Sequence, residues 1–195
     1  MKKSLFSLRL PHWLAAYESH SGSHFPDILQ RMRFVIELSR RSIDEEGGPF
    51  AAAIFRIDDG ALLASGVNLV IAGRCSLLHA EIVALMRAQL KAGSHDLSAA
   101  GLPPCELVTS TEPCAMCLGA IAWSGVRGLV CGARGEDAES IGFDEGEKPP
   151  RWQESLERRG ISVRENVLRE EAADVLWEYR AGGGRIYNPE RCAHR

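Results

Sequence analysis

The stretch CELVTSTEPCAMCLGAIAWSGVRGLVC, residues 105–131, is the part of the sequence from which the fold is predicted. It begins with a short apolar run, Cys105 to Ser110, which is typical of a buried strand. A helix is predicted over Pro113 to Trp123, and a second buried strand over Gly128 to Cys131. Helices that alternate with buried strands indicate a sheet with helices on both faces.

The segments on either side extend this pattern. Ahead of it we predict a helix from Ile28 to about Gly47, a hairpin of strands over residues 50–55 and 61–70, and a helix over residues 79–92. After it we predict a loop with a short helix over residues 136–147, a strand over 161–163 and an amphipathic helix over 167–179. The expected fold is therefore α/β, in three α/β/α layers around a five-stranded mixed sheet. Ligands of such sheets bind outside the carboxyl ends of the strands.

A chain of 195 residues fits one domain with extensions. We expect an irregular N-terminal extension over residues 1–26, the main domain over 27–183, and a tail over 184–195 that covers the active site. Hydrophobic residues make up 45% of the chain, so it can bury a core.

Charge and hydropathy exclude some classes of protein. The net charge is −3, which argues against a strongly electrostatic nucleic-acid binder. No apolar run has the roughly 20 residues that span a bilayer, and Arg9, Pro11 and His12 interrupt the stretch that a signal peptide needs. We expect a cytoplasmic protein in which a C-x-x-C pair indicates a metal or redox site.

Two short motifs carry the chemistry: His79-Ala-Glu81 and Pro113-Cys114-Ala-Met-Cys117. Cys114 and Cys117 are three apart and share a helix face, in a first turn whose dipole favours thiolates. With His79 they provide three zinc ligands and leave the fourth position to water, as in catalytic sites. We predict one Zn²⁺ per chain.

Glu81 is predicted to move protons without binding the metal. Positions i and i+2 of a helix point roughly 200° apart, so His79 and Glu81 can both approach a metal only near the helix tip. A carboxylate beside the metal-activated water can take its proton and deliver it to the substrate. A purely structural zinc site normally has four protein ligands, whereas only three obvious ones converge here.

The two motifs together match the signature of zinc nucleobase deaminases. From about Pro49 to Cys131 the chain resembles the cytidine deaminase-like superfamily, and within it the bacterial guanine deaminases. The narrower likeness rests on four segments: Gly66-Val-Asn68, CLGAIAW at 117–123, AESIGFDE at 138–145 and Ile186-Tyr-Asn188.

The resemblance implies roles for further residues. Asn68 would hydrogen-bond the base, and Phe50, Trp123 and Phe143 would line or stack on its ring. Glu145 would be a second proton shuttle that helps ammonia leave, with Asp144 as the alternative. The resemblance also implies a homodimer.

The expected function is the zinc-dependent hydrolytic deamination of a free nucleobase, with guanine converted to xanthine and ammonia by attack at C2. The alternatives are a transfer-RNA adenosine deaminase, a deaminase of another base, nucleoside or aminotriazine, and a zinc-stabilised binding or scaffold protein without turnover. The expected partner is a small-molecule nucleobase. Neither a membrane nor a nucleic acid is expected as a binding partner. Three further cysteines, Cys75, Cys105 and Cys131, are expected in the core. Cys192 and His194 are expected in the C-terminal tail.

Overall fold

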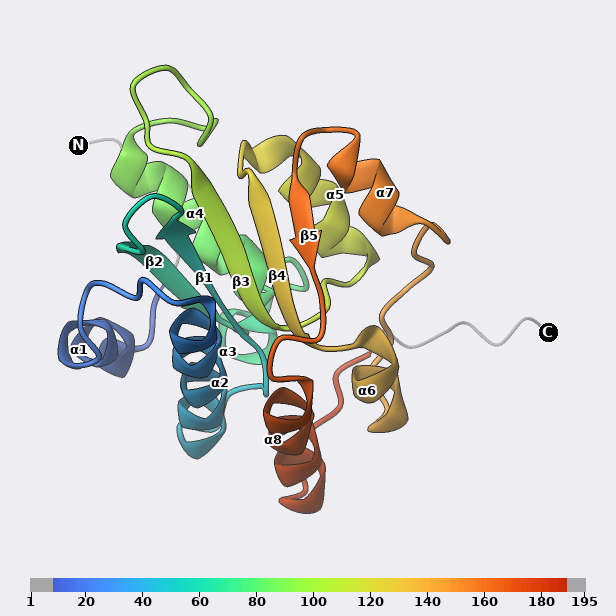
Figure 1. Ribbon diagram of the computed structural model, residues 1–195. Coiled ribbons are helices and arrows are strands. Elements are labelled where there is room, and N and C mark those ends of the chain that lie inside the picture. Colours follow the sequence, from blue (N-terminus) through green and yellow to red (C-terminus); the bar gives the residue numbers. More distant parts are fainter. Residues whose placement is uncertain (1–8, 189–195) are drawn as a thin grey trace.

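The computed structural model describes residues 9–188, which form a five-stranded sheet in the order β2-β1-β3-β4-β5 (Figure 1). β1 runs antiparallel to both β2 and β3, whereas β4 and β5 continue parallel to β3. The predicted mixed sheet is confirmed. The strands are β1 (Ala51–Arg56), β2 (Leu62–Val67), β3 (Cys105–Thr111), β4 (Gly128–Ala133) and β5 (Ser162–Arg164).

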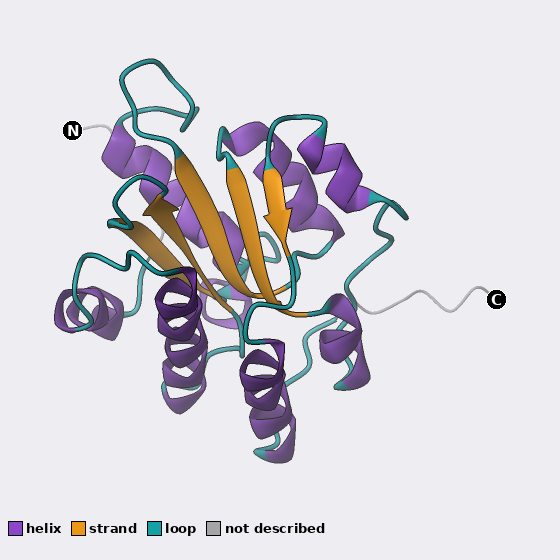
Figure 2. Ribbon diagram, in the orientation of Figure 1, coloured by secondary structure: helices purple, strands orange, loops and turns teal. Residues whose placement is uncertain are grey.

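Helices cover both faces of this sheet (Figures 1 and 2). One face carries α4 (Ala80–Ala92), α5 (Ala115–Ser124) and α7 (Trp152–Glu157). The other face carries α2 (Ile28–Asp44) and α8 (Arg169–Ala181), with α6 (Gly135–Ser140) beside α8. The remaining helices are α1 (His12–His20) and the single turn α3 (Val70–Gly73). This is the predicted α/β/α arrangement.

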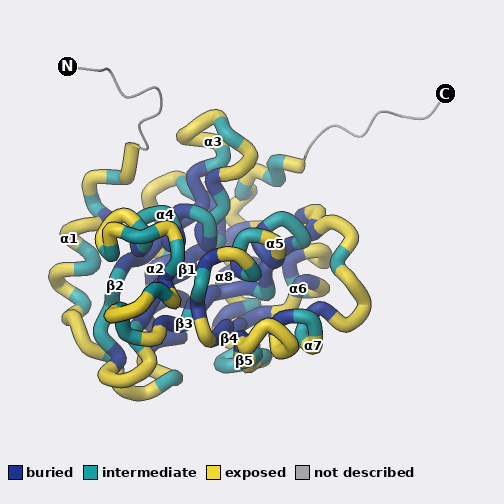
Figure 3. The backbone as a smooth tube through the Cα atoms, turned by 90° about the horizontal axis from the view of Figure 1, so that it is seen from above, coloured by how far each residue is buried: buried dark blue, intermediate teal, exposed yellow. Residues whose placement is uncertain are grey.

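The central strands are buried on both faces, as Figure 3 shows. In β1, Ala53 and Phe55 belong to the core under α2 and α8, while Ala52 and Ile54 belong to the core under α4 and α5. Successive strand residues point to opposite faces, so a continuous apolar run is what a strand between two helical layers requires.

The N-terminal prediction is wrong for residues 12–20, which form α1 instead of an irregular segment. Leu14 of this helix is fully buried. The Glu18 carboxylate accepts hydrogen bonds from the Ser65 hydroxyl (2.7 Å) and from the Arg87 guanidinium (2.8 Å). These contacts are with β2 and α4, so tertiary packing stabilises a helix that the local sequence does not reveal.

The remaining elements agree with the prediction apart from their ends and from α3 and α7, two short helices that were not predicted. Trp152 and Leu156 are the buried residues of α7, and two apolar residues are too few for a recognisable period. The domain boundaries at residues 27 and 184 stay predictions, and Cys192 and His194 lie outside the described residues. Within residues 9–188 no helix is both long and apolar enough to span a bilayer.

Candidate active site

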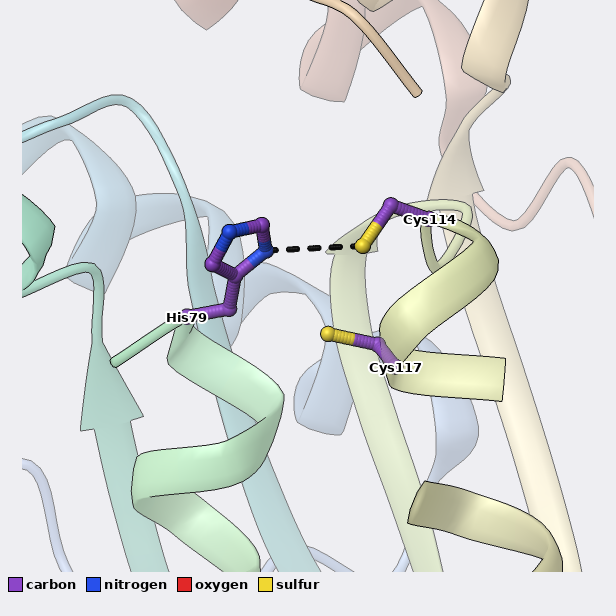
Figure 4. A group of neighbouring side chains, drawn as sticks. All are labelled: His79, Cys114 and Cys117. Carbon is purple, nitrogen blue, oxygen red and sulfur yellow. Dashed lines mark hydrogen bonds between the residues drawn. The ribbon is translucent and has the colours of Figure 1, made fainter. Parts of the chain in front are cut away.

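Two helix N-termini meet at the carboxyl end of β3. His79 is the residue just before α4, with Glu81 in the first turn of that helix. Cys114 is the residue just before α5, with Cys117 in its first turn. Figure 4 shows the imidazole and the two sulfur atoms pointing toward one another from these two helices. The structure therefore brings together residues that are 38 positions apart in the sequence, because β1 and β3 lie side by side and each helix packs on the same face.

The three candidate ligand atoms have the spacing of a metal site. One nitrogen of His79 and the sulfurs of Cys114 and Cys117 all lie within 4.8 Å of one another. The Nδ1 atom of His79 is 3.5 Å from the Sγ atom of Cys114. Tetrahedral bonds of about 2.3 Å to sulfur and about 2.1 Å to nitrogen put such ligands roughly 3.6 Å apart. The residues present thus fit a zinc ion.

The charge state of the sulfurs also fits a metal. Hydrogen bonds from Cys117 and His79 lower the pKa of the Cys114 thiol to about 4, against the opposing effect of burial. The pKa of the donating Cys117 thiol is raised, because it gives its hydrogen bond to Cys114 and is buried. A thiolate that already attracts the neighbouring thiol and imidazole is a ready ligand for a divalent cation.

Glu81 is buried beside these ligands, with 7% of its surface exposed. Burial, followed by the negative charge on Cys114, raises the pKa of this carboxyl to about 7. A group that titrates near neutrality can both accept and donate a proton under working conditions.

A cavity of about 120 Å³ lies next to the ligands His79 and Cys114, which form part of its wall. Its walls include three of the four predicted substrate residues, both predicted proton shuttles and the alternative shuttle: Asn68, Phe50, Phe143, Glu81, Glu145 and Asp144. Ligand pockets for drug-sized molecules measure roughly 300–1,000 Å³, so this cavity suits a single small ring system.

Trp123 does not line this cavity. It lies at the C-terminal end of α5, is 80% exposed, and has the Arg159 guanidinium 5.9 Å from its ring centroid. The prediction that Trp123 stacks on the substrate is wrong for the site that a single chain builds. A helix of ten residues is about 15 Å long, so its two ends cannot both reach the pocket.

Asn68 combines a turn with a place in the wall. Its Oδ1 atom accepts a hydrogen bond from the Val70 amide at 3.1 Å, which fixes the side chain at the start of α3. The residue is 5% exposed. Because a carbonyl oxygen accepts two hydrogen bonds and the amide nitrogen donates two, the group keeps capacity for a ligand in the cavity.

Three aromatic rings form one wall of the cavity. Phe143 contacts Phe50 with ring centroids 4.9 Å apart and Tyr187 with centroids 5.0 Å apart, both in edge arrangements. Sequence reasoning named the two phenylalanines but assigned no role to Tyr187.

Between the two candidate second shuttles, the structure buries Glu145 and exposes Asp144. Glu145 is 7% exposed, and its backbone oxygen accepts a hydrogen bond from the Ala115 amide at 3.0 Å. Burial, then the charge on Cys114, raises the pKa of Glu145 to about 8, although Lys148 opposes this. The Asp144 carboxylate instead accepts a hydrogen bond from the Gly146 amide.

The C-terminal segment supplies wall residues that local motifs do not reveal. Tyr187 and Asn188 both line the cavity. The Asn188 amide side chain bonds in both directions to the loop after α6, accepting from the Asp144 amide and donating to the Gly142 carbonyl. Thr109 and Thr111 at the end of β3 also line it. The predicted site-covering tail over residues 184–195 and the likeness at residues 186–188 were the indications in the sequence that this segment belongs to the site.

Known proteins share these features. Residues 27–133 match the family model described as the cytidine and deoxycytidylate deaminase zinc-binding region. The guanine deaminase of Bacillus subtilis is 40% identical over 99 residues, which span 51% of this chain and 59% of that enzyme.

Two solved structures cover almost the whole chain. The guanine deaminase of Nitrosomonas europaea is 51% identical with a TM-score of 0.88, covering 93% of this chain and 98% of its own. A structure solved in complex with 2,6-diaminopurine is 52% identical, also with a TM-score of 0.88, and covers 96% of this chain and 98% of its own.

Proposed function

The chain belongs to the cytidine and deoxycytidylate deaminase family, and from this membership we propose that it is a zinc-dependent hydrolase that converts guanine to xanthine and ammonia. The observation that carries the proposal is the 120 Å³ cavity, whose wall combines two of the three metal ligands, two buried carboxyl groups and aromatic rings. Relatives that carry the name guanine deaminase favour guanine among the possible bases.

His79, Cys114 and Cys117 would hold the metal. When bound, zinc supplies Lewis acidity that lowers the pKa of water to about 7. The chain's own residues then have to move protons, orient the base and exclude bulk water.

Glu81 and Glu145 divide the proton transfers in this proposal. Hydrolysis forms a C–O bond at C2 and breaks the exocyclic C–N bond, so protons must reach a ring nitrogen and the departing amine. Glu81, buried beside the ligands, takes the proton of the attacking water and delivers it to the ring. Glu145, on the loop after α6, delivers a proton to the amine that leaves as ammonia and regains one from the hydroxyl group on C2, which becomes the carbonyl.

The other wall residues position the base. Guanine is planar, so the faces and edges of Phe50, Phe143 and Tyr187 suit it. The amide of Asn68 can pair with donors and acceptors on the edge of the base. Tyr187 and Asn188 close the cavity from the C-terminal side and limit entry of water.

An ammonia-release assay tests the substrate. The zinc-loaded protein is given guanine, adenine, cytosine, their nucleosides and aminotriazines in parallel, and guanine should exceed every other substrate in kcat/KM. Release confined to cytidine would overturn guanine and leave a deaminase. Release only from an RNA stem-loop, with a steep salt dependence, would indicate a transfer-RNA enzyme. No release from any substrate would favour a binding or scaffold protein.

We also propose that the protein is a homodimer. Trp123 exposes 80% of its surface on α5, an exposure that association through this helix would remove. Sedimentation equilibrium should give about twice the 21.4 kDa mass of the chain, and Trp123→Glu should shift the protein toward the single-chain mass. A wild-type protein that stays at the single-chain mass at all concentrations would contradict the dimer.

A further inference from the structure

A group of buried charged side chains joins two wall residues of the cavity, Glu112 and Glu145, through Lys148. The ammonium of Lys148 is 2.6 Å from Oε1 of Glu112 and 4.0 Å from Oε2 of Glu145. The three side chains are 15%, 12% and 8% exposed, respectively. One ammonium thus lies between two carboxyl groups that are nearly removed from water.

Lys148 is the main polar partner of the Glu145 side chain, whereas Glu112 has a further partner. The Oε2 atom of Glu145 is fully buried and has no hydrogen-bond partner within residues 9–188. Lys148 provides the only ion pair that Glu145 makes among the described residues. Glu112, in contrast, also accepts a hydrogen bond from the Gly135 amide at 3.2 Å. A buried carboxyl oxygen without a hydrogen-bond donor depends on the nearby ammonium for a polar partner that fixes its position.

The backbone ties this arrangement to the metal-binding segment. Glu112 is two residues before Cys114, and the Ala115 amide, one residue after Cys114, holds the Glu145 carbonyl at 3.0 Å. Lys148 therefore connects the loop after α6 with the start of α5 on the side where Glu145 enters the cavity.

The position of the ammonium is built into the local structure. A Cβ atom added at Gly135 would lie 2.4 Å from Nζ of Lys148. The absence of a side chain at residue 135 leaves the space that the ammonium occupies between the two carboxylates.

This inference rests on the proposed role of Glu145. We propose that Lys148 is a positioning residue for Glu145. The Lys148 ammonium is anchored on Glu112 and holds the Glu145 carboxyl group in the cavity where the amine leaves. Lys148 itself does not line the cavity. It acts through Glu145, so its removal should change the rate of the chemical step more than the binding of the base.

A double-mutant cycle tests this. Lys148→Met keeps the length of the side chain and removes its charge. It should lower kcat for guanine by about 10-fold, an effect within the range measured for coupled pairs of residues. KM should change less than about threefold. In a Glu145→Gln background the same change should alter kcat less than about twofold, because there is no longer a carboxylate to position. Lys148→Arg should recover part of the rate. Lys91→Met, at an exposed lysine near the end of α4, is the matched control and should leave kcat unchanged.

The outcomes separate this inference from the proposed function. Normal kcat in Glu145→Gln alone would remove Glu145 from the mechanism and with it the role of Lys148. A second outcome is that Glu145→Gln alone lowers kcat strongly while Lys148→Met either has no effect or lowers kcat by the same factor in both backgrounds. That result would overturn the inference and leave the proposed function intact. If Lys148→Met fails to fold, Gly135→Ala displaces the ammonium and keeps its charge, and the same cycle applies to it.

Discussion

At the scale of single residues, the two carboxyl groups of the cavity reach it by different routes. Glu81 comes from a motif in which it is two positions from His79, and its place in the first turn of α4 follows from that spacing. Glu145 comes from a loop, which a hydrogen bond from the Ala115 amide to the Glu145 carbonyl ties to the start of α5. Burial raises the pKa of both groups, to about 7 and about 8, so both titrate close to neutrality.

The first prediction concerns Glu81. Glu81→Gln keeps the shape of the side chain and removes its ability to carry a proton, so kcat for guanine should fall by about 10²–10⁴-fold. Zinc content should stay at one per chain, because the three ligands are unchanged. Steady-state kinetics and metal analysis of the same preparation measure both quantities.

Glu171→Gln provides the control, since this glutamate is exposed on α8. Loss of zinc in Glu81→Gln would mean that the carboxylate contributes to metal binding, contrary to the assigned role. A kcat near that of the wild type would exclude Glu81 as the shuttle.

At the scale of elements, the position of the metal ligands depends on how closely α4 approaches β2. Gly66 of β2 faces the helix, and a Cβ atom there would lie 2.4 Å from the Ala80 carbonyl oxygen and 2.5 Å from the Ala84 amide nitrogen. Both are backbone atoms, which cannot rotate away. Since Ala80 follows His79 directly, the glycine sets the distance between the sheet and one metal ligand.

The second prediction follows from this contact. Gly66→Ala should force α4 away from the sheet and reduce the free energy of unfolding by about 3 kcal/mol, at the upper end of what overpacking costs. The same displacement should weaken zinc binding, because His79 moves relative to Cys114 and Cys117. Urea unfolding with and without zinc, and a competition assay with a chelator, provide the measurements. If Gly66→Ala kept both the stability and the zinc affinity of the wild type, the close approach of α4 to β2 would not be required.

At the scale of the whole molecule, both ends of the described chain contact the central domain. The C-terminal segment contributes Tyr187 and Asn188 to the cavity. At the other end, α1 attaches to α4 through the pair of Glu18 and Arg87, which are 14% and 11% exposed. Burial opposes ionisation of Glu18, but hydrogen bonds from Arg87 and Ser65 together lower the pKa of this carboxyl below its usual 4.5.

The third prediction gives the pH dependence of that attachment. Because the folded-state pKa of Glu18 is depressed, its stabilising contribution is present above the unfolded-state pKa and is lost as the pH falls through the folded-state value. At neutral pH, Glu18→Gln should lower the free energy of unfolding by about 2 kcal/mol, as expected for hydrogen bonds to a charged group. In acid the difference from the wild type should shrink toward zero.

Denaturant unfolding of both proteins at several pH values measures this difference. Glu178→Gln removes the 53% exposed partner of Arg40 and should cost less than about 0.5 kcal/mol at every pH. A cost for Glu18→Gln that persists unchanged in acid would exclude the ionised pair as its cause.

The strands, the main helices, the three candidate metal ligands and Glu81 could all be predicted from the sequence. Apolar period and length distinguish buried strands from helices, and residue type and spacing place His79, Glu81, Cys114 and Cys117 at two helix starts. These features are local, because a few neighbouring residues and the geometry of the first helical turn decide them.

Which distant side chains share the cavity depends on tertiary packing. It buried Glu145 and exposed Asp144, placed Trp123 outside the site, and brought Tyr187 to the wall. It also made a helix of residues 12–20, through contacts with β2 and α4. The physical reason is that burial and pairing between residues tens of positions apart depend on how complete layers pack, and local spacing carries no information about that packing.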